Sequence, residues 1–320
     1  MDPKQLISII KEIGRGKNAA RDLSREDARA LFTAVLNDAI PPLQLGAILI
    51  ALRIKGESLE ELAGFLDACE ASYRHLNAPQ VKVPLVIPAY NGARQLPNLT
   101  PLLASLVARD GVPVLVHGVL DDPGRVTTIE IFRAMGIEPA HSIAEAEEQL
   151  ATRNLAVITI DTLAPALARV LKLRREMGLR SSGHTLVKMI QPFTSKAIRL
   201  VSVTHPEYLE RMRAFFTSHA SHALLLRGAE GEAVAHPRRE PVIEWLDGET
   251  AESWHGTAEE NPELPDGRDS AVTAAWIVEV LSRKREGPAA ITHQTGCCIQ
   301  AAITKGAGKT QDVEACKKAR

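Results

Sequence analysis

The chain has 320 residues, of which 45% are hydrophobic and 24% charged, and its formal net charge is −1. This composition excludes wholesale disorder, and the length suits one large domain or two modest ones. The longest apolar stretch, residues 43–52, is too short to span a membrane, and the N-terminus lacks a basic start followed by an apolar run. We therefore expect a cytoplasmic protein without a membrane partner.

The first part of the chain, residues 5–76, shows a helical pattern throughout. Apolar residues such as Leu6 and Ile9 recur at helical spacing. Ser24 and Ser58 each precede such a segment and are followed three positions later by an acidic residue, which predicts two helix N-caps. The loops between these segments are short, so we expect an antiparallel helical bundle.

After residue 79 the pattern changes to alternating strands and helices. The expected strands, rich in Val, Ile and Leu, are 81–89, 112–117, 155–160, 198–203, 222–227 and 241–245. The expected helices are 100–109, 125–135, 142–151, 163–177, 206–218, 270–285 and 288–304. This alternation predicts an α/β domain with a mainly parallel sheet covered by helices. Residues 248–268 are acidic and rich in Gly and Pro, which predicts a surface loop.

The four cysteines, at positions 69, 297, 298 and 316, show no paired CxxC spacing, so we expect no zinc site. Cys297 and Cys298 stand together in a predicted helix and are interpreted as small core residues.

The near-neutral total charge hides two blocks of opposite sign. Residues 162–213 contain ten Lys or Arg and three Glu, a net charge of +7. Residues 229–269 contain twelve acidic and three basic residues, a net charge of −9. The two blocks could pair with each other in the fold or lie on solvated faces, or the basic block could follow a phosphate backbone.

The most informative stretch, residues 83–100, is an apolar strand that runs into a turn and then a helix. This layout can hold a phosphate, because a helix begins with free N–H groups. The turn has a single glycine, Gly92, where a close-fitting phosphate loop needs several. Asn91-Gly92 is equally typical of an ordinary turn.

Several segments together resemble the anthranilate phosphoribosyltransferase family, also called glycosyltransferase family 3. In chain order they are Leu23–Phe32, Ala47–Glu57, Arg133–Gly136, Arg175–Arg180 and His205-Pro206. The resemblance implies a small helical domain, made of residues 1–77 plus about 165–190, that mediates homodimer formation. It also implies a large α/β domain, made of residues 78–164 plus about 191–320.

The chain departs from this family at three motifs. The glycine-rich diphosphate loop is replaced by Pro88–Gly92, in which Pro88 donates no N–H. The Lys-His-Gly-Asn-Arg motif is Val116–Leu120 here, without its lysine and arginine. The family's adjacent Asp-Glu, which binds magnesium, falls at Ala233-Val234. Because phosphoribosyl transfer depends on metal and cations to stabilise the departing diphosphate, the departures predict that this activity is lost.

Residues 90–94 and 180–188 are similar to a branch of the family that is not enzymatic and binds DNA. The resemblance implies a DNA-binding protein of low sequence specificity, with RNA as a second candidate partner, and no cofactor or metal. The expected nucleic-acid contacts are Arg169, Lys172, Arg174, Arg175, Arg180, Lys188 and Arg199. The expected remnant of the phosphate or ligand pocket is Tyr90, Asn91, Gly92, Arg94, Asn98, Thr100, His117 and Gly118.

The alternative is a phosphoribosyltransferase or phosphorylase with an unidentified acceptor, and it alone would require magnesium and phosphoribosyl diphosphate. No residue is assigned a catalytic role, because the histidines near the expected cleft show neither metal-ligand spacing nor a Ser-His-Asp order.

Overall fold

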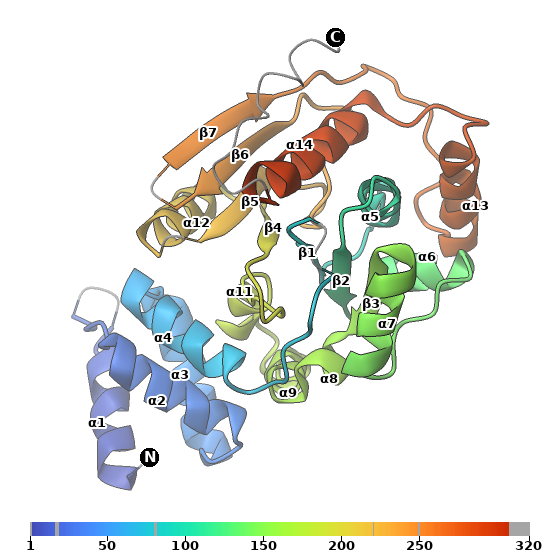
Figure 1. The fold of residues 1–320 in the computed structure, drawn as a ribbon. Coiled ribbons are helices and arrows are strands. Elements are labelled where there is room, and N and C mark those ends of the chain that lie inside the picture. The colour runs from blue at the N-terminus through green and yellow to red at the C-terminus, as the bar shows by residue number, and fades with distance from the viewer. Residues whose placement is uncertain (1, 17–18, 80–81, 220, 249, 307–320) are drawn as a thin grey trace.

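The N-terminal part of the protein is a helical bundle (Figure 1). The computed structural model describes residues 2–16, 19–79, 82–219, 221–248 and 250–306. The bundle helices are α1 (Pro3–Ile13), α2 (Arg25–Leu36), α3 (Pro42–Lys55) and α4 (Leu59–Glu70). Both predicted N-caps are confirmed, because the hydroxyls of Ser24 and Ser58 accept the backbone N–H groups of Asp27 and Glu61.

The rest of the chain folds around one seven-stranded sheet of order β3-β2-β1-β4-β5-β6-β7. The strands are β1 (Leu85–Ala89), β2 (Val114–Gly118), β3 (Leu155–Thr159), β4 (Ile198–Val203), β5 (His222–Arg227), β6 (Val242–Asp247) and β7 (Thr250–His255). The first five strands in this order pair in parallel. β6 pairs antiparallel with β5, and β7 pairs antiparallel with β6. The predicted mainly parallel sheet is therefore confirmed.

Ten helical segments accompany this sheet within the described residues. They are α5 (Thr100–Arg109), α6 (Thr128–Ala134), α7 (Ile143–Arg153), α8 (Ile160–Leu163), α9 (Pro165–Lys172), α10 (Arg174–Met177), α11 (Gly183–Leu186), α12 (Pro206–Ser218), α13 (Ser270–Leu281) and α14 (Ala289–Gly306).

Alternate strand residues enter two different apolar cores, as the period of a β-strand requires. One core contains Ile87 and Val116 and packs against α5, α6, α13 and α14, which lie together on one side in Figure 1. The other core contains Val86 and Leu115 and includes apolar residues of α7, α9, α12 and all four bundle helices. The bundle and one face of the sheet therefore share a continuous core. Within it, α9 packs against α2, and α11 against α4.

Two predicted elements differ in the structure. The single helix expected over 163–177 is instead three segments: the last residue of α8, then α9, then α10. The first break lies at Ala164, which has an extended φ of −143°. It precedes Pro165, and proline disfavours a helical conformation in the preceding residue. The predicted acidic surface loop contains the edge strand β7, which pairs with β6. Its side chains are mostly exposed, so its sequence shows no apolar alternation.

Cys297 and Cys298 lie buried on α14, as predicted, whereas Cys316 lies outside the described residues. No helix in the described ranges is long and apolar enough to cross a bilayer.

Candidate functional site

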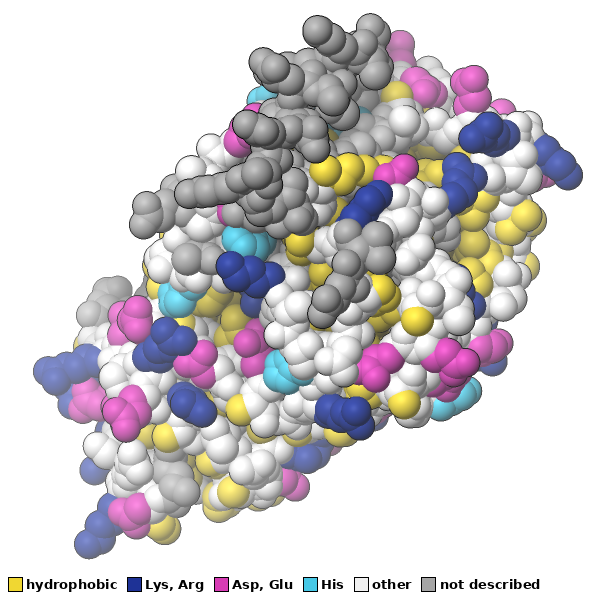
Figure 2. Space-filling view, in the orientation of Figure 1, with side chains coloured by type: hydrophobic (Ala, Val, Ile, Leu, Met, Phe, Trp, Pro, Cys, Tyr) yellow, Lys and Arg dark blue, Asp and Glu magenta, His cyan; other side chains and the backbone are white. Residues whose placement is uncertain are grey.

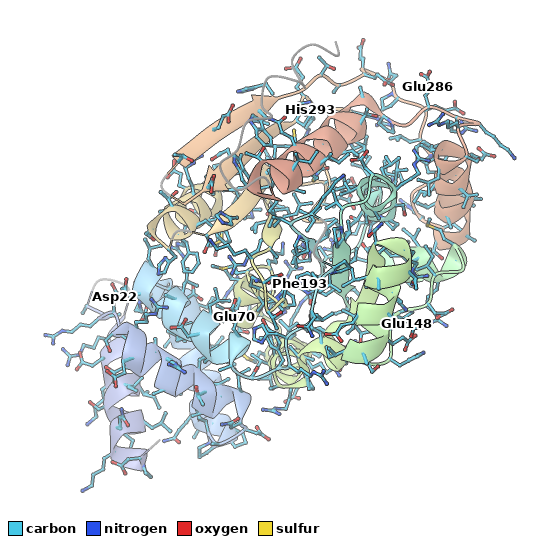
Figure 3. The ribbon with its side chains drawn as sticks, viewed as in Figure 1. Asp22, Glu70, Glu148, Phe193, Glu286 and His293 are labelled. Atoms are coloured by element: carbon cyan, nitrogen blue, oxygen red, sulfur yellow. The ribbon has the colours of Figure 1, made fainter. Side chains whose placement is uncertain are left out.

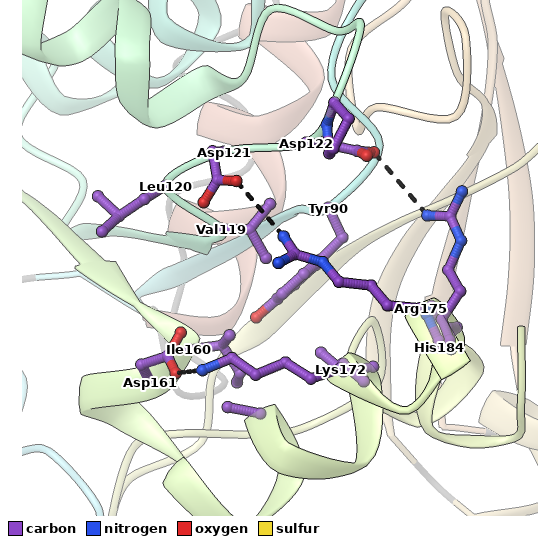
Figure 4. A pocket seen from close by; sticks show the side chains of 14 residues that line it. Tyr90, Val119, Leu120, Asp121, Asp122, Ile160, Asp161, Lys172, Arg175 and His184 are labelled. Atoms are coloured by element: carbon purple, nitrogen blue, oxygen red, sulfur yellow. Dashed lines mark hydrogen bonds and ion pairs between the residues drawn. The ribbon is translucent and has the colours of Figure 1, made fainter. Parts of the chain in front are cut away.

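The first three strands of the parallel sheet end at a hollow of about 760 Å³ (Figure 4). Tyr90 follows β1, residues 119–123 follow β2, and Asp161 follows β3, so three strand ends supply one wall. The opposite wall comes from α9, α10 and His184 on α11. The carboxyl edge of a parallel sheet is the usual position for a ligand site in this class of fold.

Three of the predicted cations face this hollow, and each meets a carboxylate across it (Figure 4). Lys172 pairs with Asp161. Arg175 lies 3.4 Å from Asp121, measured from Nη2 to Oδ2. Arg174 lies 3.9 Å from Asp122, measured from Nη1 to Oδ2. These partners come from the strand-end loops and not from the acidic 229–269 block.

Two further hollows, of about 430 and 320 Å³, lie beside the first at the boundary between bundle and sheet. Six residues line both of these hollows: Arg53, Arg180, Ser181, Thr185, Glu207 and Tyr208. His184 lines the first hollow and the 430 Å³ hollow. We call the three together the boundary cleft. Its basic lining residues are Arg53, Lys55, Lys172, Arg174, Arg175, Arg180, Lys188 and Arg211. Its acidic lining residues are Glu57, Asp121, Asp122, Asp161 and Glu207.

Arg180 lies at the centre of the boundary cleft and forms no ion pair with any described Asp or Glu. Burial lowers the pKa of its guanidinium, the like charges of Arg174, Arg125 and Arg53 lower it further, and the charge of Asp122 raises it. The Arg180 carbonyl accepts a hydrogen bond of 2.7 Å from Arg53 Nη1, which links the bundle to this segment. Asp122 is the carboxylate nearest this group, at 3.7 Å from Arg125 and 3.9 Å from Arg174, so four arginines share one neighbouring aspartate and produce a local positive potential.

Lys188 lies deeper in the same cleft. Its Nζ donates to the carbonyl oxygens of Gly231, at 3.1 Å, and Ser202, at 3.4 Å. Burial lowers the pKa of Lys188 to about 8, with Arg180 lowering it and Glu232 raising it. The pKa of neighbouring His184 falls to about 4, mainly through burial, so this imidazole is neutral at pH 7.

One of the seven predicted contacts, Arg199, belongs to the internal structure of the protein, and the prediction is corrected for it. Arg199, on β4, is 8% exposed and lies 3.6 Å from Glu70 of α4, at the junction of bundle and sheet (Figure 3). Arg169 is exposed and lies outside the lining of the boundary cleft: its Nη2 donates to the Leu36 carbonyl at 2.5 Å, at the end of α2, so its predicted role stays a prediction. Both charges belong to one basic block of the sequence, but strand alternation directs the Arg199 side chain inward, whereas Arg169 stays exposed.

Lys and Arg side chains alternate with Asp and Glu side chains over the face shown in Figure 2. The positive character of the boundary cleft therefore depends on its own lining and not on a uniformly basic surface.

The predicted ligand-pocket residues lie around the loop after β1, and all but Arg94 are buried. Tyr90 Oη and His117 Nδ1 share a hydrogen bond of 2.6 Å. Burial lowers the pKa of His117 to about 3 and raises that of Tyr90, so both groups stay neutral near pH 7. Gly118 ends β2 in register with Ala89 of β1.

The remaining pocket residues are held by hydrogen bonds within the protein. Asn98 Nδ2 donates to Thr128 Oγ1 at 2.9 Å, and Asn98 Oδ1 accepts the N–H of Thr100, the first residue of α5. The backbone N–H groups of Asn91 and Gly92 both donate to Glu232 Oε1, at 2.6 Å each. The N–H of Arg94 donates to Glu230. The loop therefore binds two carboxylates of its own chain.

Sequence analysis missed five residues of this site: Arg53, Arg211, Tyr208, Glu230 and Glu232. Arg53 stood within the family-like segment Ala47–Glu57, and the two glutamates stood beside the family's metal-binding position, so each had a local signal. Arg211 and Tyr208 had none, because only the packing of α12 brings them to the cleft.

Comparisons with known proteins agree with this architecture. Residues 7–72 match the family model described as the glycosyl transferase family, helical bundle domain. The chain is 44% identical over 297 residues to the protein YbiB of Escherichia coli (strain K12), which covers 92% of this chain and 93% of YbiB. The chain belongs to the anthranilate phosphoribosyltransferase-like glycosyltransferase family.

Enzymes named for anthranilate phosphoribosyl transfer are more distant members of this family. The anthranilate phosphoribosyltransferase of Rhizobium meliloti (strain 1021) is 29% identical over 216 residues, covering 67% of this chain and 64% of the enzyme. The crystal structure of the Thermus thermophilus enzyme superposes with a TM-score of 0.76 and 21% identity, covering 97% of this chain and 91% of the enzyme. This structural likeness shows the shared fold.

The family's magnesium–diphosphate complex does not fit the residues present here. Ala233 and Val234, at the position of the metal-binding carboxylates, are buried and apolar. The loop N–H groups that could approach a diphosphate already bind Glu230 and Glu232. In the described ranges no group of three or more His, Cys, Asp or Glu side chains is placed to hold a metal ion.

Proposed function

We propose that this protein binds nucleic acid through the phosphate backbone in the boundary cleft and does not transfer a phosphoribosyl group. The observation that carries the proposal is Arg180, half-buried among three other arginines that have Asp122 as their shared carboxylate, and itself without an ion-pair partner among the described residues. An arginine cluster of this kind attracts anions, and its guanidinium groups match the geometry of phosphate oxygens.

The surroundings of Arg180 supply the other groups that a phosphate backbone contacts. Ser181 and Thr185 line the cleft beside it, and the Ser181 hydroxyl has no hydrogen-bond partner within the described protein, whereas the Ser182 hydroxyl donates to Glu57. Hydroxyl donors and cations together are the usual partners of phosphate and sugar oxygens, and they carry no base code. We therefore expect low sequence specificity, with DNA as the main partner and RNA as a second one.

Tyr208 adds a surface on which a base can stack. Its side chain lines two of the three hollows, its exposed fraction is 39%, and Arg211 lies over its ring at 5.6 Å from the centroid. Stacking on an aromatic ring is tolerant of base identity and requires an unpaired base. This arrangement favours single-stranded over duplex nucleic acid.

The ion pairs at the mouth of the cleft are compatible with the proposal. The Arg175 and Asp121 side chains are 67% and 76% exposed, and pairs of this kind contribute only about 0–1 kcal/mol. A phosphate can therefore replace the aspartate at little cost.

The family resemblance also implies a homodimer, which would present two such clefts, and light scattering tests this part of the proposal.

The experiment measures fluorescence anisotropy of random-sequence single-stranded DNA, duplex DNA and RNA at increasing salt. Charge reversals Arg175→Glu and Arg211→Glu should weaken binding to all sequences alike, and each should reduce the salt slope by about one unit for every phosphate that the variant no longer neutralises. Arg133→Glu is the matched control, because Arg133 is an exposed arginine on α6, outside the cleft, paired with Glu138 at 3.1 Å.

Binding that is absent at low salt, or equally weakened by Arg133→Glu, would refute the cleft as a nucleic-acid site. Calorimetry with magnesium and phosphoribosyl diphosphate tests the alternative. Saturable binding of that complex would favour a transferase.

A further inference from the structure

The loop after β1 is a backbone anion-binding nest. Four of its N–H groups point to one side and donate to carboxylate oxygens. Asn91 and Gly92 bind Glu232 Oε1, whereas Arg94 binds Glu230 Oε2 at 2.5 Å and Gln95 binds Glu230 Oε1 at 3.1 Å. Each carboxylate is thus bound by a pair of backbone N–H groups, and N–H groups that converge in this way form a concavity that selects negative charge.

Both carboxylates come from one turn, residues 228–235, between β5 and β6. Glu230 has a φ of +51° and Gly231 a φ of +90°, so two consecutive residues adopt the left-handed conformation. Such strain in a residue other than glycine persists only where its surroundings hold it. Here the carboxylate of Glu230 is held by the nest.

The turn fits tightly against the loop. A Cβ at Gly231 would lie 2.4 Å from Asn91 Nδ2, so only glycine permits this approach. The Gly231 carbonyl accepts hydrogen bonds from Asn91 Nδ2 at 2.5 Å, Ser202 Oγ at 3.0 Å and Lys188 Nζ at 3.1 Å. Thr128 Oγ1 donates to the second oxygen of Glu232 at 3.2 Å. Glu232, 2% exposed, thus has a complete set of donors.

The position of the nest in the sheet is the one at which an open α/β sheet ordinarily holds its ligand. The strand order reverses between β1 and β4, and the chain leaves β1 and β4 toward opposite faces of the sheet. The crevice at such a reversal lies outside the carboxyl ends of the strands. In this protein the turn 228–235 fills it.

We propose that Glu230 and Glu232 act as a built-in anion that occupies this nest and excludes inorganic phosphate and other oxyanions of its size. An attached carboxylate binds with the advantage of high effective concentration, so a free anion cannot compete. Removing both carboxylates leaves the four N–H groups and the Thr128 hydroxyl without their acceptors, and so able to donate to a tetrahedral anion.

The test is titration calorimetry of the full chain with inorganic phosphate. The double variant Glu230→Ala/Glu232→Ala should bind phosphate saturably, at least about tenfold more tightly than the wild-type protein. Glu240→Ala is the control, because Glu240 is exposed, follows the same turn, and should leave phosphate affinity at the wild-type level. The proposal would be overturned if the double variant folds and has the same phosphate affinity as the wild-type protein, whether that shared affinity is weak or tight.

Loss of Glu232 leaves buried donors unsatisfied, so the double variant could fail to fold. In that case inorganic phosphate in the refolding buffer should restore the native circular dichroism spectrum, because it replaces the missing carboxylates. No recovery with phosphate would also overturn the proposal. Loss of Glu232 also changes the electrostatic surroundings of Lys188 in the cleft, but the nucleic-acid proposal is tested at Arg175 and Arg211 with a different measurement, so either proposal can fail without the other.

Discussion

Lys188 and Glu232 share a region from which water is largely excluded, and each controls the charge of the other. Burial is the main cause of the lowered pKa of Lys188, and it also raises the pKa of Glu232. The N–H groups of Asn91 and Gly92 act in the opposite direction on Glu232, together with the charge of Lys188. The carboxylate that occupies the nest thus also raises the pKa of a lysine that lines the cleft, against the larger effect of burial.

The first prediction at this scale concerns the titration of Lys188. Its amine should lose its proton with a midpoint of about pH 8, against the ordinary 10.5. Glu232→Gln removes the negative charge that raises this pKa, so the midpoint should move below 8. Nitrogen-15 NMR of labelled lysine side chains follows both transitions. A midpoint near 10.5 in the wild-type protein would show that Lys188 is solvated.

The sign of the pH effect on stability follows from the same shift. Because the pKa of Lys188 is lower in the folded state, the unfolded chain binds this proton more tightly. The contribution of Lys188 to the free energy of unfolding therefore rises as the pH increases from about 8 to 10.5.

At the scale of elements, the ion pair between β4 and α4 joins the sheet to the bundle. Arg199 approaches Glu70 at 3.6 Å and also lies over the Phe216 ring at 5.7 Å from its centroid. Glu70 Oε1 accepts the Gln191 N–H at 2.9 Å. Burial raises the pKa of Glu70 and lowers that of Arg199, while their mutual attraction opposes both shifts.

Removing one partner of this pair should be more destabilising than removing both. Arg199→Met keeps the contact with Phe216 but leaves Glu70 without its counter-charge, and should lower the free energy of unfolding by about 3 kcal/mol. The double variant Glu70→Gln/Arg199→Met should recover part of that loss, as urea unfolding measures. Nucleic-acid affinity should stay unchanged in Arg199→Met, and a selective loss of affinity with full stability would place Arg199 on the surface instead.

At the scale of the whole molecule, the shared core joins the bundle to the α/β part. Side chains of all four bundle helices belong to the same apolar cluster as Val86, Leu115 and Val201 of the sheet. Two parts that bury surface in one core lose that burial together when either unfolds, so we expect a single cooperative transition.

The tryptophans provide the measurement of this coupling. Trp245, Trp254 and Trp276 lie on β6, β7 and α13, so fluorescence reports on the α/β part alone. Far-ultraviolet circular dichroism reports on helices of both parts. The two signals should give the same midpoint in urea. A circular dichroism transition at lower urea than the fluorescence transition would show that the bundle unfolds independently of the α/β part.

Local signals in the sequence were enough to predict the elements and their class. Capping residues such as Ser58, apolar strands and proline positions are signals of this kind, and they predicted α4, α5, β4, β5 and α12 closely. They missed β7, because an exposed edge strand has no buried side to impose an apolar alternation. The net charge of +7 over residues 162–213 could likewise be read from the sequence.

Which charges meet depends on the packing of distant segments. The side chain of Arg199 enters the core because alternate residues of a strand face opposite sides, whereas Arg53, from a distant helix, joins Arg180 only through the packing of bundle against sheet. Glu232 reaches the loop after β1 across 140 residues of chain. Electrostatics and burial act through space, and no local pattern records which distant residues share that space.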